Sequence, residues 1–182
     1  MNLVGENLAN DKAAVLIDNS YLRMEVLDHL NGRNGKFQLD YQVFCDNLCR
    51  EIGADRFRTY IYDVSLESNR SFLTSLNLQD RFEIRSGKLM GTEKGIKQKQ
   101  VDILIAIDMI RLALKNKIQQ IILITGDSDF VPAVQYVKEE GVIVHLRRAD
   151  SYSKELSQVC DTSKPFSKSV LIEFDGKDGY HR

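Results

Sequence analysis

The sequence predicts an α/β protein with three layers, in which helices cover both faces of a mostly parallel sheet of five or six strands. Two continuous apolar runs, at residues 13–17 (AAVLI) and 121–125 (IILIT), have the length and composition of strands that are buried on both faces. Segments with helical spacing alternate with these and with other strand-like runs, and that order produces a parallel sheet.

The predicted elements follow each other without an internal repeat or a linker. We expect strands at residues 13–17, 57–62, 82–86, 121–125 and 142–146, and helices at 40–52, 66–78, 101–115 and 130–140. Asp40 is the expected N-cap of its helix, and Gly53 and Gly141 are expected helix ends. A turn is expected at 31–35, a polar loop at 88–100, and either a final strand or a tail at 170–174.

Length and composition indicate one folded domain. The chain has 182 residues, of which 43% are hydrophobic and 28% charged. Its net charge of −1 excludes a polycation that binds nucleic acid by bulk charge, although a local basic patch remains compatible with it. We predict an extension at 1–12, the domain at 13–164, and a strand or tail at 165–182.

The sequence also predicts a cytoplasmic protein that does not enter a membrane. No signal peptide is visible, and the apolar runs are far shorter than the roughly 20 residues that a membrane span needs. The odd set of Cys45, Cys49 and Cys160 indicates reduced thiols, and the scattered histidines do not complete a zinc site with them.

Acidic residues follow the two most apolar strands at the point where each strand ends. Asp18 follows residues 13–17, and Asp127 and Asp129 follow residues 121–125. Open α/β sheets bind ligands beyond the carboxyl ends of their strands, and these two strands are expected to be central and adjacent. The three carboxylates are therefore expected to share one cleft, with Asp63 as a weaker candidate for it.

A helical projection of residues 101–115 adds a fourth carboxylate. Asp102 falls among Ile105 and Met109 on the apolar face that should pack on the sheet. Asp108 falls instead with Arg111, on a polar face that we expect to point to solvent. Asp102 is thus predicted at the cleft end of the buried face.

Four converging carboxylates would raise the pKa of one another unless a cation neutralises them. Oxygen ligands select hard ions such as Mg²⁺ or Mn²⁺, which can activate water for attack on a phosphodiester. The proposed metal ligands and catalytic residues are Asp18, Asp102, Asp127 and Asp129. Three lysines that precede Asp102 are candidate phosphate contacts: Lys94, Lys97 and Lys99.

Each candidate also has a purely structural alternative. Asp18 could only end its strand in a turn, and Asp102 could only be an acid that the helix dipole favours. Asp127 or Asp129 could cap the following helix, and the three lysines could belong to a solvated loop. His145 is expected to be a strand residue with satisfied hydrogen bonds rather than a catalyst.

Three ordered motifs make the chain similar to a known family. They are LIDNS at residues 16–20, KQVDILIAID at 99–108 and TGDSDFVPAV at 125–134. Together they resemble the NYN domain of the PIN-like nuclease superfamily, most closely its LabA-like bacterial branch, over residues 13–160. The resemblance implies a three-layer α/β/α fold with a PIN-like sheet and a metal-dependent ribonuclease activity.

The resemblance also assigns roles to individual positions. The family's acidic positions fall on the four aspartates already proposed, and the implied nucleic-acid contacts include Asn19, Ser128 and Lys99. Asp108 matches the second acid of its motif, and its role is left open. Gln100 stands where many relatives carry glycine.

Two functions remain in competition at this point. The first is a Mg²⁺- or Mn²⁺-dependent ribonuclease that acts on RNA, which could be structured. The second is a non-catalytic regulator that binds RNA or a nucleotide on the same fold. A phosphotransferase of the haloacid dehalogenase type fits less well, because D-S-D follows a late strand here, and no G-x-G-x-x-G supports a dinucleotide-binding enzyme. The protein is expected to be a monomer or a homodimer.

Overall fold

The computed structural model describes residues 10–27, 39–92 and 95–166, and its sheet confirms the predicted α/β class. Within these residues the strand order is β4-β3-β2-β1-β5-β6-β7. All neighbouring strands are parallel except β4, which pairs antiparallel with β3. The strands are β1 (Lys12–Asp18), β2 (Asp55–Val64), β3 (Phe82–Thr92), β4 (Gly95–Lys99), β5 (Gln120–Ile124), β6 (Ile143–Arg148) and β7 (Thr162–Pro165).

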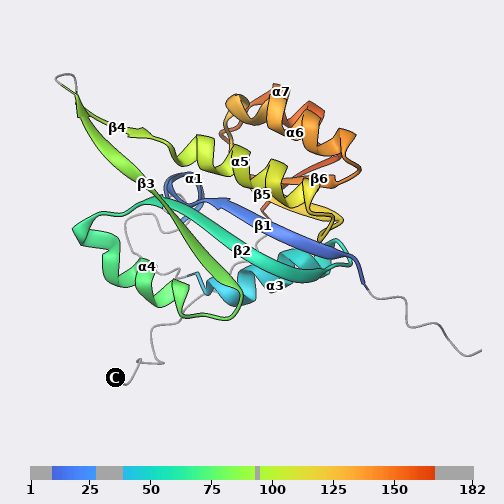
Figure 1. Ribbon diagram of the computed structural model, residues 1–182, viewed down its shortest axis with the longest axis horizontal. Coiled ribbons are helices and arrows are strands. Elements are labelled where there is room, and N and C mark those ends of the chain that lie inside the picture. Colours follow the sequence, from blue (N-terminus) through green and yellow to red (C-terminus); the bar gives the residue numbers. More distant parts are fainter. Residues whose placement is uncertain (1–9, 28–38, 93–94, 167–182) are drawn as a thin grey trace, which may run out of the picture.

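Helices cover both faces of the sheet and make three layers (Figure 1). One face carries α3 (Tyr41–Glu51) and α4 (Arg70–Asn77), which follows the single turn η2 (Glu67–Asn69). The other carries α5 (Val101–Leu114), α6 (Val131–Glu139) and α7 (Lys154–Val159). Three short turns lie at the carboxyl ends of β1 and β5: α1 (Asn19–Tyr21), η1 (Leu22–Leu27) and η3 (Ser128–Phe130).

The two apolar strands lie side by side at the centre of the sheet, as predicted. β1 pairs with β5 from Ala13 opposite Gln120 to Ile17 opposite Ile124. Every residue of β5 is buried, as are Ala13 to Ile17 of β1. Alternate side chains of both strands enter two separate apolar clusters, one under each helical layer. A strand that is buried on both faces needs this continuous apolarity.

The predicted helix ends of α3 are confirmed. The Asp40 carboxylate accepts hydrogen bonds from the backbone N–H groups of Gln42 and Val43, at 3.0 and 3.1 Å. Gly53 follows the helix with a φ of +68°, a conformation that glycine adopts without strain.

The three cysteines are free and buried, and burial raises the pKa of each thiol to about 12.

Two parts of the sheet differ from the prediction. Residues 88–100 were expected to form a loop, but 88–92 and 95–99 pair as an antiparallel hairpin that projects from the body of the protein (Figure 1). Backbone hydrogen bonds between the two strands hold such a hairpin together. The pattern of apolar residues in the sequence does not reveal them. The polar segment TSKP forms β7, which the sequence did not predict. The turn predicted at 31–35 and the strand or tail at 170–174 lie outside the described residues.

Among the described residues, no helix has both the length and the apolar character that crossing a membrane requires.

Candidate active site

Asp18 occupies the carboxyl end of β1 and is partly buried. Its Oδ1 accepts a hydrogen bond from the Tyr21 backbone N–H at 3.1 Å, which caps α1. Its Oδ2 accepts a longer bond, 3.4 Å, from the Thr125 hydroxyl. Burial, and to a smaller extent the charge of Asp102, raises the pKa of Asp18 to about 6, although its hydrogen bonds oppose the shift. Asp18 therefore changes charge close to neutral pH.

Asp102 lies in the first turn of α5 and is coupled to the other acids. Its pKa is raised by burial first, and then by the negative charges of Asp127 and Asp129. Charge coupling of this kind weakens with distance. Asp102 is therefore near enough to Asp18, Asp127 and Asp129 for their charges to interact. They come from three segments, namely the end of β1, the start of α5 and the loop after β5.

The loop after β5 is tied to β1 through Thr125. The hydroxyl of this buried residue donates to Asp18 and accepts from the backbone N–H of Asp127, at 3.4 Å in each case. Asp127 then caps the turn η3, because its Oδ1 accepts from the Asp129 N–H at 2.9 Å. Asp127, Ser128 and Asp129 are all exposed. The expected capping role thus falls on Asp127 and leaves the Asp129 carboxylate in solvent.

A pocket of about 430 Å³ opens beside Asp18 and Asp127. The sequence did not identify Glu25 of η1, nor Ser151 and Ser153 of the loop before α7, which also line it. No pattern in the sequence reports this meeting, because the segments are far apart in the chain. Tyr21 joins them: its hydroxyl donates to the Ser151 carbonyl at 2.8 Å and accepts from the Ala149 N–H at 2.9 Å.

Asn19 is completely buried, and its side chain is occupied inside the protein. Its amide donates to Asp63 at 2.6 Å, and its carbonyl oxygen accepts from the Tyr41 hydroxyl at 2.6 Å. Asp63, at the end of β2, is buried as well. Asn19 and Asp63 therefore stabilise the strand ends next to Asp18, and neither side chain lines the 430 Å³ pocket.

Asp108 does not point to solvent, which corrects the helical projection. It is only 5% exposed and accepts from the Tyr62 hydroxyl at 3.0 Å, Arg85 Nε at 3.2 Å and Arg111 Nη1 at 3.0 Å. The projection grouped Asp108 correctly with Arg111 but assigned that face to water. Tyr62 and Arg85 reach the same face from β2 and β3 and satisfy the carboxylate. Asp108 is thus separate from the candidate metal ligands.

Two of the three predicted phosphate contacts belong to a strand of the β3–β4 hairpin. Lys97 and Lys99 belong to β4, which leads through Gln100 directly into α5 and Asp102. Lys94 lies outside the described residues. Gln100 has a φ of +107°, in the region that favours glycine and strains a residue with a Cβ.

The donor set fits a hard divalent cation in its chemistry. It consists of carboxylate oxygens. Burial and neighbouring negative charges raise the pKa of Asp18 and of Asp102, and a cation would offset both effects. Among the described residues, no group of three or more Asp, Glu, His or Cys side chains already has the arrangement of a metal site. His145 is not a candidate ligand, since its ring nitrogens are hydrogen bonded to Thr162 and Gln120, as expected for a satisfied strand residue.

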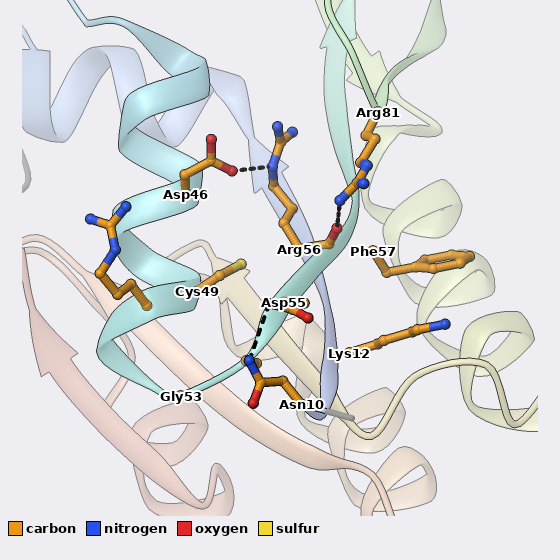
Figure 2. Close-up of a pocket in the computed structure, with 11 residues that line it drawn as sticks. Asn10, Lys12, Asp46, Cys49, Gly53, Asp55, Arg56, Phe57 and Arg81 are labelled. Atoms are coloured by element: carbon orange, nitrogen blue, oxygen red, sulfur yellow. Dashed lines mark hydrogen bonds and ion pairs between the residues drawn. The ribbon is translucent and has the colours of Figure 1, made fainter. Parts of the chain in front are cut away.

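A larger pocket, about 840 Å³, lies at the opposite end of the parallel strands, where β1 and β2 begin (Figure 2). Its buried cation Arg56 is held by Asp46 at 2.6 Å and by the Thr59 hydroxyl. Figure 2 shows Lys12 pointing away from the Arg56 guanidinium, so these two cations do not converge. Its position is also the wrong end of a parallel sheet for catalysis.

The fold and the acidic edge define an α/β protein with a candidate catalytic cleft at the carboxyl ends of β1 and β5. Residues 12–166 match the model of the NYN domain family, and the chain belongs to this family. It is 33% identical over 105 residues to protein y4oD of Sinorhizobium fredii, itself uncharacterized; the match covers 56% of this chain and 48% of y4oD, about half its length.

A solved structure confirms the architecture. The crystal structure of a protein of unknown function, VPA0982 from Vibrio parahaemolyticus, superposes with a TM-score of 0.70 over 92% of this chain and 99% of that chain. Its sequence identity is 19%, so the likeness shows the fold alone.

Proposed function

We propose that this protein is a divalent-metal-dependent nuclease that hydrolyses RNA phosphodiesters at the acidic edge of its sheet. The observation that carries the proposal is the coupling of Asp18 and Asp102, two partly buried acids whose pKa values are raised by burial and by neighbouring carboxylates. Such an arrangement is costly to fold, and a bound cation offsets that cost. Membership of a family related to nucleases supports the same reading.

Each residue then has a distinct role. Asp18 and Asp102 would hold Mg²⁺ or Mn²⁺, with Asp127 and Asp129 as further ligands. The ion, when bound, would supply an activated water and neutralise charge on the phosphate. Asp18 keeps its orientation through Tyr21 N–H and Thr125, while Asn19 and Asp63 fix the strand ends beneath it.

The chain would hold its substrate on two sides of the acids. Lys97 and Lys99 on β4, together with Lys94, would contact phosphates that flank the cleavage point. The pocket beside Asp18 contains serine residues and Glu25 but no lysine or arginine, so it suits a sugar or base better than a phosphate. Placement in the LabA-like branch and a cytoplasmic location belong to this proposal as well.

A second candidate function is a regulator that binds RNA without cleaving it. The observation that favours it is that Asp18 and Asp127 already use carboxylate oxygens to cap local turns. A purely structural role for these acids would leave the same hydrogen bonds in place.

Calorimetric titration with Mn²⁺ separates the two functions. We expect saturable binding by the wild type, loss of binding in Asp18→Asn/Asp127→Asn, and retention in Asp80→Asn. Asp80 is an exposed acid just before β3. It lies at the amino-terminal end of that strand, away from the candidate metal ligands, and serves as the matched control. A panel of single-stranded and structured RNAs then tests cleavage. Binding of RNA without metal uptake or turnover would establish the regulator instead.

A further inference from the structure

Helix α5 has an apolar stripe on the side that faces away from the sheet. Its inner face packs into the core through buried residues such as Ile105 and Met109. On its outer face, Ile103, Ile107 and Leu114 are 61%, 46% and 54% exposed. Ile110, which is partly buried, completes the stripe. A surface helix normally carries polar residues on its outer side, whereas α5 carries apolar residues on its outer side as well as on its inner side.

The stripe runs the length of the helix and contains no charged residue. Its members are spaced by four, three and four residues, which places them on one line along the surface of a helix. Leu104, also partly buried, lies at the margin of the stripe. The flanking cation Arg111 is neutralised by Asp108 at 3.0 Å. The apolar side chains of two copies can therefore meet without a charged side chain inside the stripe.

We propose that α5 is the contact surface of a homodimer in which two copies of the stripe pack antiparallel around a two-fold axis. The spacing reads the same in both directions, so an antiparallel second copy places Ile103 opposite Leu114 and Ile107 opposite Ile110. A two-fold interface requires this self-complementarity, whereas an unrelated partner does not. The proposal is independent of the metal and nuclease assignments.

The size of the surface sets the strength of the contact. A helix of 14 residues is about 21 Å long, and a standard interface buries about 800 Å² per partner. One helical face supplies only part of that area. The dimer is therefore weak and forms with increasing protein concentration, in the manner of small transient interfaces.

Sedimentation velocity over a range from low micromolar to submillimolar protein tests the dimer. We expect the wild type to shift from monomer to dimer, and Ile107→Glu to remain a monomer throughout. Leu78→Glu is the matched control, because Leu78 is an exposed apolar residue next to α4, on the other face of the sheet. Far-UV circular dichroism verifies that both variants are folded. A wild type that stays monomeric, or an Ile107→Glu variant that still dimerises, overturns the proposal.

Disulfide trapping tests the antiparallel geometry. Ile103→Cys and Leu114→Cys, mixed and oxidised, should form a cross-linked dimer, while either variant alone should form much less. The three native cysteines are buried and do not compete in the folded protein. Equal or greater cross-linking in the single variants would overturn the antiparallel arrangement.

Discussion

Asn19 and Asp63 are joined by a buried hydrogen bond of 2.6 Å, although 44 positions separate them in the chain. The bond ties the carboxyl end of β1 to that of β2, one residue away from the Asp18 carboxylate. Tyr41 of α3 completes the group by donating to the Asn19 carbonyl oxygen. The carboxyl ends of the strands that carry the candidate metal ligands are therefore supported by a buried polar network as well as by apolar contacts.

Asn19→Ala should destabilise the protein by more than Tyr41→Phe does. The first variant removes the partner of the Tyr41 hydroxyl and that of Asp63 Oδ2, although Asp63 Oδ1 still accepts from the Val64 backbone N–H. Each buried atom left unpaired costs about 1–3 kcal/mol. Tyr41→Phe removes a single hydrogen bond and leaves only the Asn19 oxygen unpaired. Urea unfolding measures both changes. Equal, small losses would show that water replaces the network.

Gly126→Ala should disturb the site through a steric clash. A Cβ at this position would stand 2.6 Å from a ring carbon of Tyr21 and 2.9 Å from the Ser151 carbonyl oxygen. Overpacking of this kind costs about 1–3 kcal/mol, and here it would displace Tyr21 from the pocket wall. Thermal unfolding and Mn²⁺ titration measure the two effects. The same substitution in a Tyr21→Ala background should cost less, since only the Ser151 contact remains.

Gln100→Gly should stabilise the protein by about 1 kcal/mol. The residue has a φ of +107°, where a side chain strains the backbone and glycine does not. Part of the gain is offset by the greater freedom of glycine in the unfolded chain. Gln100→Ala, which keeps a Cβ, should bring no such gain. A free energy of unfolding that falls in the glycine variant would contradict the strain argument.

The parts of the fold that the sequence predicts are those whose cause is local. Residues 13–17 and 121–125 are apolar throughout because the sheet buries both faces of each strand, and that requirement is visible in composition. The β3–β4 hairpin and β7 depend on backbone pairing with a neighbour, which leaves no apolar signature. Topology places Asp18 and Asp127 at one edge, and so their neighbourhood could also be predicted.

The contacts that the sequence does not predict join distant segments. Asp108 is held by Tyr62 and Arg85, which are 46 and 23 positions away, and a helical projection contains neither. The pocket wall forms where Tyr21 meets Ser151, 130 positions apart. Burial of Asn19 has the same origin. Helical projection and motif spacing identify which residues share a face of an element. Whether that face is exposed to solvent depends on which side chains from other elements pack against it.

Asp108→Asn should reduce stability and leave metal binding intact. The carboxylate accepts from the buried Tyr62 hydroxyl and from two arginines, so its loss weakens three hydrogen bonds at a cost of about 1–3 kcal/mol. Asp102→Asn should do the reverse and abolish Mn²⁺ binding with little loss of stability. Urea unfolding and calorimetry on both variants measure the contrast. Loss of metal binding in folded Asp108→Asn would return this residue to the site.

Asp18 should make the metal-free protein less stable as pH rises through about 6. Its pKa is raised from 3.8 to about 6 by burial, so the folded state holds the proton more tightly than the unfolded state does. The penalty is absent below pH about 4, grows between the two values and then stays constant at about 3 kcal/mol. Asn caps a helix as well as Asp does, so Asp18→Asn should be more stable than the wild type at pH 8 and similar at pH 4.

The same proton competes with the metal. Mn²⁺ affinity of the wild type should fall by up to about tenfold per pH unit below pH about 6, because the ion binds only the deprotonated carboxylate. Urea unfolding of the wild type and Asp18→Asn from pH 4 to pH 8, with and without Mn²⁺, measures both effects. In the wild type, saturating Mn²⁺ should reverse the loss of stability above pH 6, and in Asp18→Asn it should have little effect. Equal stabilisation of the two proteins by the ion would place the metal elsewhere.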